Sequence, residues 1–169
     1  MLGLHPLNLC NKRIEYAYLL AKEAHKGQKR WKGEDYFENH VSQVAGLCEE
    51  LSYPPITGKL RDKLIRGALL HDVVEDTNVT LDEIYFQFDR EIGDAVDAIT
   101  KQENEPYVDY IKRCSKNKLA RIVKIQDIKH NTSDPTTLSI NKLRLYELAI
   151  AYMELAEELA SIKEQHEST

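Results

Sequence analysis

Apolar residues recur at intervals of three and four along most of the chain, the spacing that places side chains on one face of a helix. The first stripe follows Asn11, a residue type that caps helix N-termini, and it stops near Gly27. No segment alternates between apolar and polar residues for long, so strands are not expected. We therefore predict an all-α orthogonal bundle. Its further helices are expected over about 41–51, 58–72, 90–99, 106–114, 118–131 and 139–163.

A capping box marks the start of one more helix. In Thr80-Leu81-Asp82-Glu83, the Thr80 hydroxyl and the Glu83 carboxylate can each accept a hydrogen bond from the other residue's backbone N–H. Pro106 suits the first turn of the helix that follows the polar stretch KQENE. No repeat, linker or low-complexity block interrupts these elements, and 169 residues fit one compact unit. We expect a single domain that spans residues 1–169.

The overall composition indicates a globular protein with a surplus of acids. Apolar residues make up 42% of the chain and charged residues 30%, and the net charge is −5. A negative surface does not favour broad binding to nucleic acid or to an anionic membrane. Nowhere do 18 apolar residues run together, as a membrane span would require. We expect neither nucleic acid nor a membrane as a partner.

The three cysteines indicate a reducing compartment. Cys10, Cys48 and Cys114 are odd in number and lack the CxxC spacing of thiolate zinc sites. A disulfide framework is not expected, and buried packing is the simplest role for each thiol. The first residues also lack the basic and apolar regions of a secretory signal, so we expect a cytoplasmic protein. His5 and His166 lie in polar ends, where we expect them to be solvated.

Ionisable residues cluster at the end of one predicted helix. His71 and Asp72 follow the apolar run GALL and precede VVEDT, which contains Glu75 and Asp76. Burying these groups together without a counter-charge would be costly, because a carboxylate resists ionisation in an apolar interior. A bound cation would resolve this conflict. By itself, however, a His-Asp dipeptide is equally well explained by a core histidine at a helix end.

Two residues from other predicted helices strengthen the metal interpretation. His40 lies at the start of one helix, after an aromatic turn, and Asp127 interrupts the apolar stripe of Leu119 and Val123. Imidazole and carboxylate ligands together suit Mn²⁺, Fe²⁺, Co²⁺ or Zn²⁺, whereas Ca²⁺ prefers oxygen ligands throughout. The residues therefore predict a site for one of these four ions.

Three ordered motifs match a known family. They are AHKGQKRWKGEDYFENH at 24–40, GALLHDVVEDTNVTLDEI at 67–84 and VKIQDIKHN at 123–131. On these motifs the sequence resembles the HD superfamily and, within it, the hydrolase domain of RelA/SpoT-type alarmone enzymes and the small alarmone hydrolases. The resemblance implies an HD-domain-like helical bundle. The chain departs from the family pattern at Val41 (usually proline), at Gln126-Asp127-Ile128 (often Ala-Asp-Arg) and in a shorter 101–117 region.

The resemblance also implies roles for residues of this chain. One divalent ion, Mn²⁺ with Fe²⁺, Co²⁺ and Zn²⁺ as alternatives, would be held by His40, His71, Asp72 and Asp127. Glu75 and Asp76 would flank the attacking water as the catalytic pair. Arg30 and Asn131 would contact the nucleotide substrate. His25 also matches the family, and we expect it to be a core residue or to orient the site.

A basic loop supplies further candidate substrate contacts. Between His25 and His40 the chain carries four cations and an indole, namely Lys26, Lys29, Arg30, Lys32 and Trp31. The loop must return towards the metal, where its cations could hold a di- or triphosphate. Trp31 or the guanidinium plane could stack on a base. A solvated charged loop is the plain alternative.

These features predict the hydrolysis of a nucleotide phosphate or pyrophosphate ester. The resemblance implies a specific activity, that of a guanosine 3′,5′-bis(diphosphate) 3′-pyrophosphohydrolase. Two alternatives stay open, an HD phosphohydrolase for another nucleotide phosphate and a non-catalytic module that senses a nucleotide. In each case the partner is a small nucleotide. The apolar stripe of the last helix is explained equally by internal packing and by self-association, so the oligomeric state is open.

Overall fold

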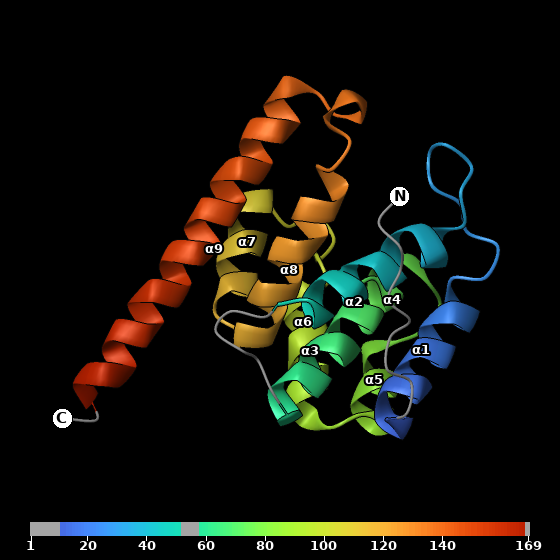
Figure 1. The fold of residues 1–169 in the computed structure, drawn as a ribbon, viewed down its shortest axis with the longest axis horizontal. Helices are drawn as coiled ribbons and strands as arrows, with labels where there is room; N and C mark the ends of the chain where they lie inside the picture. Colours follow the sequence, from blue (N-terminus) through green and yellow to red (C-terminus); the bar gives the residue numbers. More distant parts are fainter. Residues whose placement is uncertain (1–10, 52–57, 168–169) are drawn as a thin grey trace.

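The computed structural model describes residues 11–51 and 58–167 and is built of helices (Figure 1). Within these ranges the only extended pairing is one antiparallel bridge between Lys29 and Asp35, so the all-α prediction is confirmed. The elements are α1 (Lys12–Ala24), the π-helical turn η1 (Phe37–Val41), α2 (Ser42–Glu49), α3 (Gly58–Leu70), α4 (Val73–Asp76), α5 (Leu81–Gln87), α6 (Arg90–Ile99), α7 (Tyr107–Ser115), α8 (Lys118–Asn131), the 3₁₀ turn η2 (Pro135–Thr137) and α9 (Ile140–Glu167).

Helix α8 is the central element of the bundle. It contacts α2, α3, α6, α7 and α9, and its side chains Val123 and Ile128 are fully buried. Helix α9 packs on α7 and α8, and its C-terminal half continues past them (Figure 1). The turn between α3 and α4 and the turn η1 meet the same central region. The bundle thereby gathers the three chain segments in which the metal ligands were predicted.

Local side chains cap the predicted helix starts. Asn11 accepts the Arg13 backbone N–H at 2.9 Å. Both halves of the capping box are present, since the Glu83 carboxylate accepts the Thr80 backbone N–H at 2.7 Å and Thr80 Oγ1 accepts that of Glu83 at 3.3 Å. Pro106 lies at the N-cap of α7, one position before the first turn that was expected for it.

The segments that carry the predicted ligands differ from the expected helices. His40 lies in the π-helical turn η1 and not at the start of an α-helix. The wider turn allows Phe37, His40 and Val41 all to be buried, and such turns are common at functional sites. Helix α3 ends before His71, so that His71 and Asp72 form a turn and the acids after them lie on the one-turn helix α4.

The described cysteines are packing residues. Cys48 and Cys114 are buried free thiols, as predicted. His166 is exposed, whereas Cys10 and His5 lie outside the described residues. No helix in the described part of the chain is both long and apolar enough to cross a membrane.

Two helical glycines are expected to respond oppositely to alanine. An added Cβ at Gly93 in α6 would overlap the Tyr85 ring, whereas at Gly46 in α2 it would meet nothing within 4 Å. Gly93→Ala should lower the free energy of unfolding by about 1–3 kcal/mol, because the Tyr85 ring must move. Gly46→Ala should raise it by up to about 1 kcal/mol through helix propensity. Urea unfolding measures both changes, and an equal response would contradict the packing of α5 on α6.

Candidate metal centre

Four predicted ligands converge although they come from three separate parts of the chain. His40 lies in η1, His71 and Asp72 in the turn after α3, and Asp127 in α8. Asp72 Oδ2 is 2.9 Å from His71 Nε2 and 3.1 Å from His40 Nε2, and the two Nε2 atoms are 3.3 Å apart. Asp127 Oδ1 lies 3.3 Å from His40 Nε2 and 3.8 Å from His71 Nε2. The two imidazoles and the Asp72 carboxylate therefore form one close group, and the Asp127 carboxylate borders both imidazoles.

The spacing of these four atoms suits a single ion. Ligand bonds of about 2.1 Å separate neighbouring donor atoms by about 3.0 Å in octahedral geometry and by about 3.4 Å in tetrahedral geometry. The separations among the His40, His71 and Asp72 donor atoms are 2.9–3.3 Å, close to these values, and Asp127 Oδ1 lies 3.3 and 3.8 Å from the two imidazole nitrogens. Packing also holds the donors in place, because the side chains of His40, His71 and Asp127 are at most 5% exposed. The residues present fit a divalent metal.

Neighbouring groups orient both imidazoles with Nε2 towards the cluster. His71 Nδ1 donates to the Ala68 carbonyl at 2.7 Å. His130 Nδ1 lies 3.2 Å from Arg30 Nη1 and 3.0 Å from His40 Nδ1. Burial, together with the charges of His40 and Arg30, lowers the pKa of His130 to about 4, so its ring is neutral. Because the Arg30 guanidinium can only donate, His130 Nδ1 is the acceptor, and His40 Nδ1 is then the donor of the 3.0 Å contact. This is the orientation that metal binding through Nε2 requires.

Hydrogen-bond donors also restrain both carboxylates. Tyr36 Oη donates to Asp72 Oδ2 at 2.7 Å. Lys124 Nζ donates to Asp127 Oδ2 and Asn131 Nδ2 donates to Asp127 Oδ1, each at 2.6 Å. Lys124 and Asn131 stand three and four residues from Asp127, so the α8 helix itself places them beside it. Such outer contacts keep ligand oxygens in position for a metal.

The cluster attracts positive charge. Although burial acts against it, Asp127 and Asp72 raise the pKa of His40 to about 9. Burial also disfavours charge on Asp72, yet the His71 and His40 imidazoles hold the pKa of Asp72 well below its usual range. Burial disfavours charge on Asp127 as well, but Lys124 and the two imidazoles together outweigh it, so the pKa of Asp127 is also lowered. Both carboxylates are therefore ionised at neutral pH and can neutralise a divalent ion.

The predicted catalytic acids lie beside the predicted ligands. Glu75 and Asp76 are on α4 and line one cavity, the metal-side cavity, which three of the four predicted ligands, His40, Asp72 and Asp127, also line. Tyr36 Oη, which donates to Asp72, is also 3.2 Å from Asp76 Oδ2, and Glu75 Oε2 accepts the Lys101 backbone N–H at 2.9 Å. Burial raises the pKa of both Glu75 and Asp76. Carboxyl groups with raised pKa values in such a cavity are suited to proton transfer.

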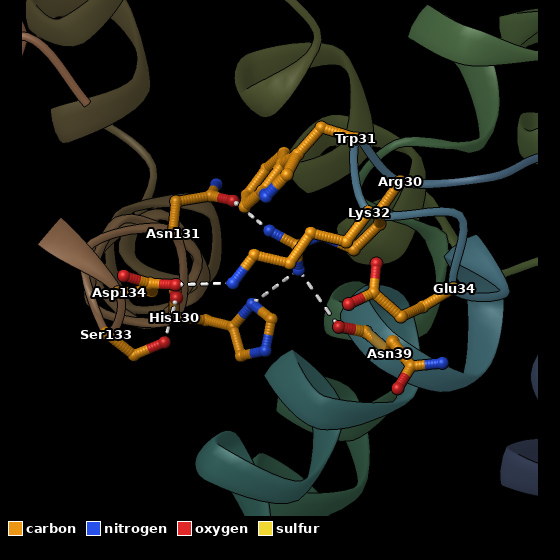
Figure 2. Close-up of a pocket in the computed structure, with 9 residues that line it drawn as sticks. All are labelled: Arg30, Trp31, Lys32, Glu34, Asn39, His130, Asn131, Ser133 and Asp134. Atoms are coloured by element: carbon orange, nitrogen blue, oxygen red, sulfur yellow. Dashed lines mark hydrogen bonds and ion pairs between the residues drawn. The ribbon is translucent and has the colours of Figure 1, made fainter. Parts of the chain in front are cut away.

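A second cavity adjoins the metal-side cavity (Figure 2). The two have volumes of about 190 and 330 Å³, and Arg30, Trp31 and Asn131 line both. Arg30 donates to the Asn39 carbonyl at 2.9 Å and to Asn131 Oδ1 at 3.3 Å, and its Cζ lies 4.2 Å from the centre of the Trp31 ring. Trp31 is 58% exposed, so its ring offers a stacking surface to a planar ligand. The structure thus brings the three predicted substrate contacts together.

The lysines of the basic loop do not all lie at the site. Lys29 lines the metal-side cavity and Lys32 the adjoining one. Lys26 instead pairs with an exposed glutamate of α1 at 3.0 Å, so the prediction that the whole cluster faces the metal is wrong for this residue. The reason is local, because the chain reverses at Gly27, which has a φ of 81°, and Lys26 precedes that turn.

His25 is a core residue that also supports the site. It is fully buried, and its Nδ1 lies 2.8 Å from Gln28 Oε1. Its ring packs against Tyr36 with centroids 5.2 Å apart, and Tyr36 donates to Asp72. Both roles that the sequence left open are therefore compatible with this position.

Three residues at the site had no role in the sequence prediction: Tyr36, Lys124 and His130. Lys124 and His130 each stand three residues from Asp127, and this spacing on one helix was a usable signal. Tyr36 follows an irregular loop, where no periodicity indicates which way a side chain points. Only the tertiary structure places it between Asp72 and Asp76.

Sequence comparisons identify relatives of this chain. No model of a protein family matches it. The bifunctional (p)ppGpp synthase/hydrolase SpoT of Escherichia coli K12 is 33% identical over 119 residues, which are 70% of this chain and 16% of that protein. The guanosine-3′,5′-bis(diphosphate) 3′-pyrophosphohydrolase of Vibrio cholerae is 29% identical over 117 residues, 69% of this chain and 16% of the relative. The chain thus spans about a sixth of the length of these relatives.

A solved structure matches the whole fold. It is described as a metazoan orthologue of SpoT that hydrolyses ppGpp and plays a role in starvation responses. The match has a TM-score of 0.68 at 19% identity and covers 97% of this chain and 98% of the other. At that identity the likeness concerns the fold, and it confirms the predicted architecture of the helical bundle.

Proposed function

We propose, from the premise that this chain is a member of the HD superfamily related to SpoT, that it is a metal-dependent hydrolase of a nucleotide pyrophosphate ester. The specific reaction is removal of the 3′-pyrophosphate from guanosine 3′,5′-bis(diphosphate). The names of the relatives support this substrate. The observation that carries the proposal is the convergence of four buried or half-buried donors, His40, His71, Asp72 and Asp127.

The donor set supports one first-row divalent ion, Mn²⁺ with Fe²⁺, Co²⁺ and Zn²⁺ as alternatives. Four protein ligands leave coordination positions for water and a phosphate oxygen if the ion is five- or six-coordinate. When bound, such an ion lowers the pKa of water and neutralises charge on the phosphate. The protein contributes the fixed orientation of His40 and His71 through their Nδ1 contacts.

The acids on α4 are proposed to move the protons. One of Glu75 and Asp76 takes the proton of the attacking water, whose oxygen forms a bond to the phosphorus attached to the 3′ oxygen. The bond from that phosphorus to the 3′ oxygen breaks, and the other acid returns a proton to this oxygen. The products are GDP and pyrophosphate. Burial raises the pKa of each carboxyl, which is the direction that favours a role in proton transfer.

The adjoining cavity is proposed to hold the nucleoside. Trp31 offers its exposed ring to the base, and Arg30 is held behind that ring by Asn39 and Asn131. Lys29 on the metal side supplies positive charge for the phosphates. This division places the nucleoside in one cavity and the reacting pyrophosphate in the other.

Turnover assays on metal-reconstituted protein test the proposal. Protein loaded separately with Mn²⁺, Co²⁺ or Zn²⁺ is incubated with guanosine 3′,5′-bis(diphosphate), and GDP and pyrophosphate are quantified. Both products should appear in equal amounts. No turnover with any of the three ions would overturn the substrate assignment. Release of phosphate from another nucleotide would favour the second hydrolase hypothesis, and tight binding without turnover the sensing module.

The proposed partner is a small nucleotide in the cytoplasm. The net charge of −5 supports neither nucleic acid nor an anionic membrane as a further partner. The cations at the site belong to a short loop and to α8, and they do not form an extended basic stripe of the kind that nucleic acid requires.

Removing the stacking surface should weaken substrate binding. Trp31→Ala is expected to raise KM by about 5- to 150-fold with little change in kcat, since stacking on a base is worth about 1–3 kcal/mol. Trp31→Phe should restore most of the affinity. Phe86→Ala, at a 91% exposed aromatic on α5, is the control. Steady-state kinetics separate the parameters, and an unchanged KM in Trp31→Ala would exclude stacking on this ring.

A further inference from the structure

Helix α9 carries an apolar stripe with heptad spacing on a face that the bundle leaves exposed. The stripe covers residues 145–162, about 26 Å of helix. Its members alternate at intervals of three and four residues, and they are 37–69% exposed. We call these six residues the heptad stripe: Leu145, Leu148, Tyr152, Leu155, Leu159 and Ile162.

A different face of α9 packs against the bundle. Ala149 and Met153 are buried, and Tyr146 and Ile150 pack against the core. Internal packing therefore accounts for Tyr146, Ile150 and Met153, which belong to the apolar stripe that the sequence predicted for this helix, and it does not account for the heptad stripe. A row of six large apolar side chains in contact with water is unusual for a protein with no partner on that face.

We propose that the heptad stripe is the contact between two copies of this chain, which pair through α9 as a parallel two-stranded coiled coil. Heptad spacing is self-complementary, because the a and d positions of one helix fit between those of an identical helix. Val108 and Ile111 of α7 extend the apolar surface into a groove of about 440 Å³ beside the N-terminal half of the stripe. The pairing is a property of α9 and does not depend on the proposed hydrolysis.

The charges beside the heptad stripe favour the parallel orientation. The seven positions of a heptad are lettered a to g. If Leu145 is at position a, then Glu158 is at position g and Lys163 is at position e. A parallel pair places each Glu158 next to Lys163 of the second copy, which gives two complementary contacts. In an antiparallel pair whose stripes overlap fully, Lys142 of each copy would lie next to Lys163 of the second copy. These like charges would repel each other.

The surroundings of the stripe favour an assembly of two copies. Ala149, which flanks the stripe at an e position, is buried against the bundle, so the bundle closes that side of the N-terminal half of the stripe and leaves room for one further helix there. A membrane surface is a poor alternative occupant. The exposed charges outside the stripe are balanced, with Glu147, Glu154 and Glu158 against Lys142, Arg144 and Lys163, whereas helices that lie on anionic membranes carry a clear excess of lysine and arginine.

Sedimentation of the full chain tests the pairing. The wild type should form a species of twice the 19.5 kDa chain mass in a concentration-dependent way. Leu155→Glu should raise the dimer Kd at least ~100-fold, because it places a charge in both copies at the centre of the contact. Glu154→Lys, at the exposed neighbouring position outside the stripe, is the control. Circular dichroism shows whether each variant keeps its helices.

A wild type that stays monomeric at all concentrations would overturn the proposal, as would a Leu155→Glu variant that dimerises normally. A charge exchange tests the orientation. Glu158→Lys should weaken the dimer about 10-fold, and adding Lys163→Glu should restore it. If the double variant remains as weak as Glu158→Lys alone, the parallel arrangement is wrong. Unchanged metal content in all variants keeps this result separate from the hydrolase proposal.

Discussion

Replacing Asp127 by asparagine is expected to lower metal affinity by at least about 100-fold and to abolish measurable turnover. Loss of an outer contact to a ligand already costs about 10- to 100-fold in affinity, and Asp127 is itself a proposed ligand. It is also one of only two carboxylates that face His40 Nε2 among the described residues. Metal analysis of the purified variant after dialysis against a defined ion measures the effect directly.

The same substitution affects folding, so a second variant is needed. Asp127 is the acceptor for Lys124 Nζ at 2.6 Å, and the lysine is largely buried. Leaving a buried charge unpaired costs about 3–5 kcal/mol, so Asp127→Asn alone should be less stable. Combining it with Lys124→Met removes the unpaired cation and should restore stability in urea unfolding. Stoichiometric metal in this stable double variant would show that Asp127 is not a ligand.

Replacing Asp76 by asparagine is expected to lower kcat by about 10²- to 10⁴-fold, the usual contribution of a general acid or base. Metal content and substrate affinity should stay close to the wild type, because Asp76 lies beside the ligand cluster and does not belong to it. Single-turnover kinetics with the metal-loaded variant measure the chemical step. A kcat equal to that of the wild type would remove Asp76 from the mechanism.

Two matched variants sharpen this result. Glu75→Gln should also reduce kcat, and the pH profiles of the two variants should lose opposite limbs if one residue is the base and the other the acid. Asp82→Asn, at an exposed acid in the first turn of α5, is the control for loss of one negative charge. A similar loss in the control would indicate a general electrostatic effect and not proton transfer.

The sequence by itself determined the features that depend on neighbours within about four residues. The Thr80–Glu83 capping box and the Asn11 cap form as predicted, because their hydrogen bonds join residues two or three apart. The apolar stripes of α6 and α8 are buried for the same reason, since helix periodicity sets them. The choice of His40, His71, Asp72 and Asp127 came from motif order, which identifies residues but not their distances.

Only the tertiary structure decided which distant groups meet. His40 and His71 are 31 residues apart in sequence, yet their Nε2 atoms lie 3.3 Å apart because η1 and the α3–α4 turn pack together. Loop direction is decided in the same way, and the turn at Gly27 sends Lys26 outwards and Arg30 inwards. Helix α9 shows most clearly what the sequence alone cannot predict. Periodicity predicts an apolar face on α9, but which face meets the bundle depends on where α7 and α8 lie.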